Sequence, residues 1–266
     1  NFPNHRQKRL WANSAQDRLW AQTTSRYARN LKGSKTMPLL SQNKSSSLAK
    51  LTLFGLTLIA AGCGEVYRGS LQHAEIFVVG DSALEWHLRS GRSAPDRMGE
   101  ELDRPEYNAA RRGQMMTEGL ETSIPNQYID GDWDWVVING GFNDLSDLCQ
   151  CGECPATQEN IHTVLSDFVS DRVEEGKRVL LWSYYDMPRG LFNAEECNDA
   201  IQRLRTQKRT LADAHPNVFW VDGRDAISKD KRRYYYIDRV HPSRLGSKRI
   251  GQQLANAILA AEESEE

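Results

Sequence analysis

The chain has 266 residues, with 34 lysines and arginines against 36 aspartates and glutamates, and a formal net charge of −2. This near balance gives no electrostatic reason to expect a nucleic-acid partner. The length allows one domain of ordinary size together with additional segments. A short basic run at 229–233 is typical of a solvent-exposed loop.

Residues 37–62 have the pattern of a secretory signal peptide. Lys44 and Lys50 precede an apolar run at 51–61, and small residues follow it. This run is shorter than the roughly 20 residues of a membrane-spanning helix. The ending Ala-Ala-Gly-Cys63 also resembles a bacterial lipobox, so Cys63 is the predicted lipidation site and first mature residue. An ordinary signal peptide and an uncleaved anchor are the alternatives.

The segments beside this signal complete the expected organisation. Residues 1–36 precede a potential start at Met37, so we interpret them as a disordered or wrongly assigned extension, with a transit peptide as the alternative. Residues 64–73 are the predicted linker, and 74–262 the predicted globular domain. The protein is therefore expected to be exported to a periplasm or cell envelope, with membrane attachment through Cys63 if that residue is lipidated.

Apolar β-type runs alternate with amphipathic helical patterns along the domain. Strands are predicted at 74–79, 107–110, 134–139, 178–183 and 218–221. Helices are predicted at 83–88, 96–103, 114–128 (interrupted at Pro125), 157–175, 193–214 and 243–261. This alternation predicts an α/β fold with a parallel sheet of about five strands and helices on both faces.

Several polar residues follow the predicted strands directly. Ser82 and Gly113 come after the first two, Asn143 follows the third, and a segment at 238–241 follows the last. Ligands of open parallel sheets bind beyond the carboxyl ends of the strands. Residues far apart in sequence should therefore meet at one edge.

Ser82, His241 and Asp238 have the chemistry of nucleophilic catalysis. A serine hydroxyl needs a base near neutral pH, and the His241 imidazole can supply it. Asp238 can bond the other ring nitrogen and fix the tautomer. The alternative for each residue is structural: Ser82 and Asp238 as caps or turn residues, and His241 as a loop histidine.

Acyl transfer also needs hydrogen-bond donors for the negative oxygen of the intermediate. The candidates are the backbone N–H groups of Ser82 and Gly113 and the side-chain amide of Asn143. A strand-ending turn is the alternative for residues 141–144, because three of these four residues favour turns.

These segments, Gly80-Asp81-Ser82, Gly113, residues 141–144 and residues 238–242, resemble in order and spacing the four sequence blocks of the SGNH, or GDSL-type, hydrolases. The resemblance covers about 74–261. It implies a flavodoxin-like three-layer fold, a serine nucleophile with a histidine base and its aspartate, a Ser–Gly–Asn oxyanion hole, and no metal or organic cofactor. The second block departs most from the family pattern, because Ala109-Ala-Arg-Arg112 precedes Gly113.

Four cysteines, Cys149, Cys151, Cys154 and Cys197, lie beyond Cys63. Two disulfides are favoured over a structural zinc site because the protein is expected to be exported. Three pairings exist, and the one that joins Cys149 to Cys151 is the least favoured on geometry. Cys149, Cys151 and Cys154 lie in a predicted cysteine-rich loop after Asn143, and a bridge from this loop to Cys197 would fix a wall of the site.

The main hypothesis is a serine esterase acting on a small or glycan-linked acyl ester. An O-acetyl esterase or acyltransferase of an envelope glycan, and a non-catalytic lipid-anchored binding protein, are the alternatives. Five residues near the site in sequence could line a pocket: Trp86, Phe142, Tyr184, Tyr185 and Arg239. Packing is the favoured role for all of them except Phe142 and Arg239.

Overall fold

The structure is a computed structural model, and it describes residues 67–117, 119, 122–190 and 193–264. The predicted signal segment, Cys63 and the extension before them lie outside these residues. The helices of the described part do not reach the length and apolar character that a membrane span requires.

Within the described residues, five parallel strands form one sheet in the order β2-β1-β3-β4-β5. The strands are β1 (Ile76–Val79), β2 (Glu106–Asn108), β3 (Trp135–Ile138), β4 (Arg178–Ser183) and β5 (Val218–Asp222). This is the flavodoxin-like order, whose direction reverses between β1 and β3. The predicted α/β class and parallel sheet are confirmed.

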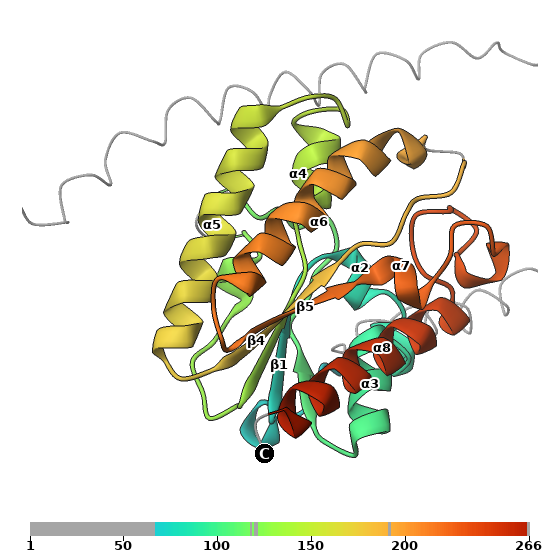
Figure 1. Ribbon diagram of the computed structural model, residues 1–266. Helices are drawn as coiled ribbons and strands as arrows, with labels where there is room; N and C mark the ends of the chain where they lie inside the picture. Colours follow the sequence, from blue (N-terminus) through green and yellow to red (C-terminus); the bar gives the residue numbers. More distant parts are fainter. Residues whose placement is uncertain (1–66, 118, 120–121, 191–192, 265–266) are drawn as a thin grey trace, which may run out of the picture. The chain divides into compact units, whose positions relative to one another are not determined.

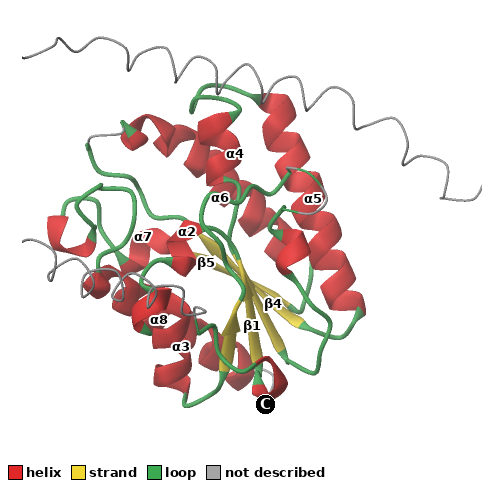
Figure 2. Ribbon diagram, turned by 180° about the vertical axis from the view of Figure 1, so that it is seen from behind, coloured by secondary structure: helices red, strands yellow, loops and turns green. Residues whose placement is uncertain are grey.

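The sheet lies between two helical layers (Figures 1 and 2). α5 (Pro155–Glu174) and α6 (Asn198–Asp213) cover one face, and α3 (Ala94–Leu102) packs with α8 (Arg244–Glu263) on the other. The short helices are α2 (Ser82–Glu85), α4 (Phe142–Asp147) and α7 (Gly223–Ala226). The 3-10 helices are η1 (Leu71–His73), η2 (Leu88–Ser90), η3 (Pro125–Gln127), η4 (Ala194–Cys197) and η5 (Arg232–Tyr234).

The strands are apolar because helices cover both faces of the sheet. Every residue of β1 and β3 is buried. Trp135 and Trp182 are among the largest fully buried side chains. This core fixes the carboxyl ends of β1 and β3, where the turns of the candidate site begin.

The predicted helix at 114–128 is wrong. Among the described residues of this stretch, the only helix is η3. Met116 and Ile124 lie against Gly140. The buried Asp144 carboxylate accepts the backbone N–H groups of Met116 and Thr117 at 2.8 and 3.0 Å. The segment therefore has apolar contacts and backbone partners without forming a helix.

Other elements differ in extent. α4 lies where we predicted a turn and a cysteine-rich loop, and α2 is shorter than the helix predicted at 83–88. Part of the predicted linker contacts the sheet, because the Arg68 carbonyl accepts the Asn108 N–H at 2.8 Å and its guanidinium donates to the Asn108 and Ala110 carbonyls. These contacts cover the outer side of β2, an otherwise unpaired sheet edge.

Candidate active site

Ser82 lies on a tight turn between β1 and α2. Gln127 holds this turn with two hydrogen bonds: it accepts the Gly80 N–H at 2.8 Å and donates to the Gly80 carbonyl at 2.9 Å. A Cβ atom on Gly80 would lie 1.9 Å from the Asn139 Oδ1, so the close approach requires glycine at this position. The turn is therefore fixed from two sides before Ser82 begins α2.

The buried Asp81 connects this turn to the neighbouring strands. Its Oδ1 accepts the Ala83 N–H and the Asn139 amide, both at 2.9 Å, and its Oδ2 accepts the Tyr184 hydroxyl. The Asp81 N–H donates to the Asn139 Oδ1 at 3.1 Å. Asp81 is thus an N-cap of α2 and also a link between the ends of β1, β3 and β4.

The structure brings Ser82, His241 and Asp238 together. The His241 Nε2 lies 2.9 Å from the Ser82 Oγ, and its Nδ1 lies 2.7 Å from the Asp238 Oδ2. The other carboxylate oxygen of Asp238 accepts the N–H groups of Val240 and His241, each at 3.0 Å. This geometry allows the imidazole to take a proton from the serine while the carboxylate fixes its tautomer.

Desolvation acts to raise the pKa of Asp238, but the hydrogen bonds from the His241 backbone and ring and from the Val240 N–H outweigh it. The pKa of Asp238 therefore lies below its usual range, and the group is a carboxylate near neutral pH. A carboxylate beside the Nδ1–H also stabilises the imidazolium that forms when His241 accepts a proton.

Trp86 is stacked on His241. The two ring centroids are 3.7 Å apart and the planes differ by 6°. The backbone N–H of Trp86 donates to the Ser82 carbonyl at 2.9 Å, so the two residues belong to the same helical turn. The Arg112 guanidinium lies 4.4 Å from the indole centroid and forms an ion pair with Glu85 at 2.8 Å. The predicted packing role of Trp86 omitted this contact with the imidazole.

The two other predicted donor positions lie on adjacent segments. The Asn143 amide donates to the Gln114 carbonyl at 2.8 Å, which places it beside the residue that follows Gly113. Gly113 has φ +69°, a conformation that favours glycine. A primary amide has two N–H groups, so Asn143 can donate to a second acceptor. The Ser82 N–H is at the start of α2, where amides lack an intrahelical acceptor.

Asp144 is a site residue to which we assigned no function from the sequence. Besides accepting the backbone N–H groups of Met116 and Thr117, it accepts the Thr117 hydroxyl at 2.6 Å. Together with Asn143 it attaches the segment after Gly113 to α4. Its position after a Gly-Gly turn was visible in the sequence, but its partners could not be identified from local pattern.

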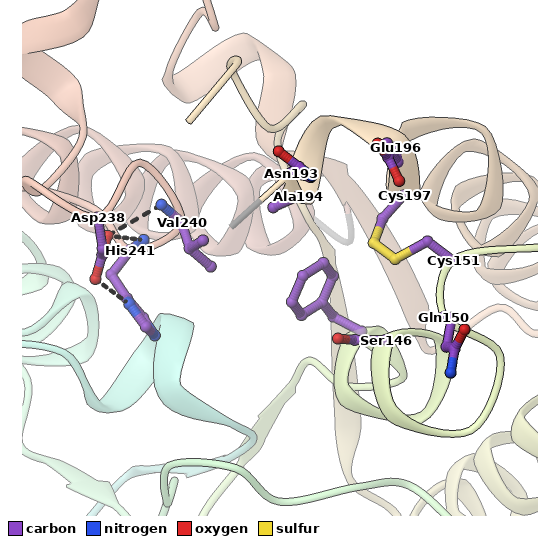
Figure 3. Close-up of a pocket in the computed structure, with 11 residues that line it drawn as sticks. Ser146, Gln150, Cys151, Asn193, Ala194, Glu196, Cys197, Asp238, Val240 and His241 are labelled. Atoms are coloured by element: carbon purple, nitrogen blue, oxygen red, sulfur yellow. Dashed lines mark hydrogen bonds and ion pairs between the residues drawn. A yellow bond between two sulfur atoms is a disulfide. The ribbon is translucent and has the colours of Figure 1, made fainter. Parts of the chain in front are cut away.

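A pocket of about 530 Å³ opens beside the triad (Figure 3). It is lined by Phe142, Ser146, Gln150, Cys151, Asn193, Ala194, Glu196, Cys197, Asp238, Val240 and His241. Phe142 is in this set, as predicted, whereas Arg239 is not. Tyr184 and Tyr185 are buried, in agreement with their predicted packing role.

The four cysteines beyond Cys63 form two disulfides, Cys149–Cys154 and Cys151–Cys197, with Cα–Cα distances of 5.8 and 4.5 Å. Figure 3 shows the Cys151–Cys197 bridge on the side of the pocket opposite Asp238 and His241. This bridge joins the cysteine-rich loop to η4 and forms part of the pocket wall.

The sequence matches the GDSL-like lipase/acylhydrolase family over residues 78–249. With its flavodoxin-like sheet and a serine at the end of β1, the protein belongs to this family of SGNH hydrolases and is an enzyme that hydrolyses ester bonds. No protein with a curated description is significantly similar to the chain in sequence.

Solved structures share the fold at low identity. An acetyl xylan esterase, AlAXEase, has a TM-score of 0.55 and 20% identity, with 69% of this chain and 98% of that chain covered. A GDSL-like lipase from Bacteroides thetaiotaomicron has a TM-score of 0.51 and 16% identity, with 80% of this chain and 97% of that chain covered. A catalytic mutant of an acetylxylan esterase from Geobacillus stearothermophilus has a TM-score of 0.50 and 17% identity, with 73% of this chain and 96% of that chain covered.

Proposed function

We propose that the protein is a serine esterase that cleaves carboxylic esters through an acyl-enzyme. Ser82 attacks the carbonyl carbon while His241 accepts its proton, and Asp238 orients the imidazole. The observation that carries this proposal is the pair of contacts at 2.9 and 2.7 Å on either side of the His241 ring.

The negative oxygen of the tetrahedral intermediate would be stabilised by the N–H groups of Ser82 and Gly113 and by the Asn143 amide. Collapse of the intermediate breaks the ester C–O bond, and His241 returns the proton to the leaving alcohol. Water then attacks the acyl-enzyme in the same way, which releases the acid and restores Ser82.

We further propose that the substrate is a short acyl ester of a polar alcohol, including a glycan. Ser146, Gln150 and Asn193 give the pocket hydrogen-bonding groups, while Phe142 and the disulfide give it an apolar surface. Two of the three structural neighbours described above are named acetyl xylan esterases. Comparing esters of increasing acyl length with acetylated sugars would separate this substrate from a lipase-type one.

Export, with lipidation of Cys63, is also part of the proposal. The signal pattern at 37–62 supports it, and disulfides persist mainly in oxidising compartments. Mass spectrometry of the mature protein from the native host would show whether Cys63 is the lipidated first residue.

The test of the nucleophile combines turnover and labelling. Ser82→Ala should lower the kcat for p-nitrophenyl acetate by about 10⁴-fold or more and abolish labelling by a fluorophosphonate. Ser90→Ala is the matched control, because the Ser90 hydroxyl donates to the His87 carbonyl and not to the imidazole. Retention of turnover and labelling by the Ser82→Ala protein would remove this assignment.

A further inference from the structure

The hairpin that carries Asp238 and His241 belongs to a basic stretch of the chain. The segment 229–249 contains eight lysines and arginines against two aspartates, a formal charge of +6 in a chain whose net charge is −2. None of these eight side chains forms an ion pair with another described residue. We call this segment the basic face, and in Figure 1 its loop projects from the body between α7 and α8.

Three large apolar side chains are exposed on the basic face. Ile237 is 75% exposed, Tyr236 45% and Leu245 43%. The Tyr236 N–H donates to the His241 carbonyl at 2.8 Å, which closes a hairpin with Ile237 near its tip. All three apolar residues line one hollow together with Arg244. They therefore form a cluster next to a positive charge and differ from isolated exposed apolar residues.

The positive potential extends toward the triad. Desolvation lowers the pKa of His87, and the charges of Arg244 and Arg112 lower it further. A second hollow, beside the first, is lined by Trp86, Arg89 and Arg112 with Tyr236. The Trp86 indole lines this hollow and also stacks on the imidazole.

We propose that the basic face docks on the surface of an anionic lipid bilayer. Ile237 and Leu245 would enter the boundary between headgroups and acyl chains, while Arg233, Arg244 and their neighbours bind lipid phosphates. A soluble acidic polymer would neutralise the same charges but leave Ile237 in water, whereas a bilayer accommodates both kinds of side chain. This surface is distinct from the predicted lipidation at Cys63.

Docking in this orientation places the triad at the membrane, since Asp238 and His241 belong to the same hairpin as Ile237. In this respect the inference rests on the proposed esterase function, and it implies that esters held at the bilayer surface are the accessible substrates. The docking itself does not depend on the chemistry of Ser82.

Vesicle binding of the full chain tests the proposal. We expect a larger fraction of the protein to sediment with vesicles of equal parts phosphatidylcholine and phosphatidylglycerol than with vesicles of phosphatidylcholine alone. This difference in the sedimented fraction should vanish in about 1 M salt. Arg233→Gln and Arg244→Gln should each weaken partition about fivefold. Ile237→Ser with Leu245→Ser should weaken it about tenfold or more.

Ile129→Ser with Leu259→Ser is the matched control, since these residues are 47% and 44% exposed and lie outside the basic face. All variants carry the same N-terminal segment, so any affinity of that segment is common to them. Amide hydrogen exchange supplies a local readout: anionic vesicles should slow exchange at 232–248 in the wild-type protein and in the control variant, but not in the Ile237→Ser/Leu245→Ser protein.

Equal partition of the two double variants, together with unchanged exchange at 232–248, would overturn the proposal. Binding to soluble polyglutamate without binding to anionic vesicles would also overturn it, in favour of an acidic polymer. Fluorophosphonate labelling of Ser82 in solution should be the same in all these variants, so loss of labelling reports failure of the proposed function and not of docking.

Discussion

Ser82 and Trp86 reach His241 from a single helical turn. The serine oxygen is at 2.9 Å from one ring nitrogen, and the indole covers a face of the same ring. The Asp238 carboxylate contacts the second ring nitrogen. The imidazole plane is thus defined by three neighbours, of which only two follow from the triad pattern in the sequence.

The pH dependence of activity depends on which of these groups takes up a proton. Because the pKa of Asp238 is lowered, its carboxylate keeps its charge as the solution is acidified, and the loss of a general base then requires a single proton. We expect log(kcat/KM) for p-nitrophenyl acetate to fall with a slope of about one on the acid side, as for a single proton. A slope near two would show that a second group titrates and contradict the assignment of Asp238 as a permanent carboxylate.

Removal of the indole should impair catalysis and leave binding intact. Trp86→Leu is expected to lower kcat about tenfold with little change in KM, because the imidazole loses the surface that orients it. Trp86→Phe should recover most of the rate, since an aromatic face is restored. Steady-state kinetics of both variants measure the effect.

Trp220 provides the control for this prediction. It is half-buried, its Nε1–H donates to the Ser183 hydroxyl at 2.8 Å, and the Arg209 guanidinium lies 5.5 Å from its ring. Trp220→Leu should leave kcat unchanged. An equal loss of kcat in the two leucine variants would indicate a general structural effect of removing a tryptophan.

At the scale of elements, the turn between β1 and α2 depends on Gln127. Gln127→Met removes both bonds to Gly80 and leaves a buried N–H without a partner, so we expect a loss of about 2–3 kcal/mol in the free energy of unfolding. Urea denaturation measures it. Gln158→Met should be neutral or stabilising, because the buried Gln158 Nε2 has no partner among the described residues. A stable Gln127→Met protein would argue against this role.

The two disulfides should differ in their contribution to stability. Cys151 and Cys197 are 46 residues apart, and Cys149 and Cys154 are 5 apart. The chain-entropy model gives about 4 kcal/mol for the longer loop and about 2 kcal/mol for the shorter one. Paired Cys→Ser variants, compared by denaturant unfolding, test this order, and a larger loss from the short bridge would reverse it.

Secondary structure was predictable where the local pattern agreed with tertiary contacts. The apolar run at 134–139 forms β3 because helices cover both faces of the sheet. The apolar residues at 114–128 also suggested an element, but Met116 and Ile124 pack as loop residues whose backbone partners come from a carboxylate on α4. Such a partner, 28 residues away, is not encoded in the local pattern.

The same distinction applies to the candidate site. Ser82, Asp238 and His241 could be named from the sequence because each follows a strand of a parallel sheet, which places them at one edge. Gln127 could not, because it lies 47 residues from Gly80, at the end of the short 3-10 helix η3 that the local pattern did not predict. Its contribution depends on how the loop after β2 returns under the turn.

For the whole molecule, the half-buried Glu106 and the buried Lys208 should shape the pH dependence of stability. Burial raises the pKa of Glu106 to about 7 from 4.5, and burial lowers the pKa of Lys208 to about 7 from 10.5. Between pH 4.5 and 7 the folded state binds more protons at Glu106, so stability falls as pH rises. Between 7 and 10.5 the unfolded state binds more at Lys208, so stability rises.

The two groups therefore predict a minimum in their combined contribution near pH 7. In urea unfolding across this range, Glu106→Gln should remove the decline on the acid side and Lys208→Met the rise on the alkaline side. Glu174→Gln, at the exposed end of α5, serves as the control and should follow the wild-type curve. Variant curves parallel to the wild type would show that neither group titrates as described.

The hairpin at 235–242 has one further consequence. Asp238 binds the backbone and the ring of His241 within four residues, and the Tyr235–Pro242 bridge closes the loop behind them. The imidazole and the carboxylate thus form one unit within the hairpin, and the contact between His241 and Ser82 joins this unit to the turn before α2. In the proposed esterase, a displacement of the hairpin would separate His241 from Ser82 and leave the contact between His241 and Asp238 intact.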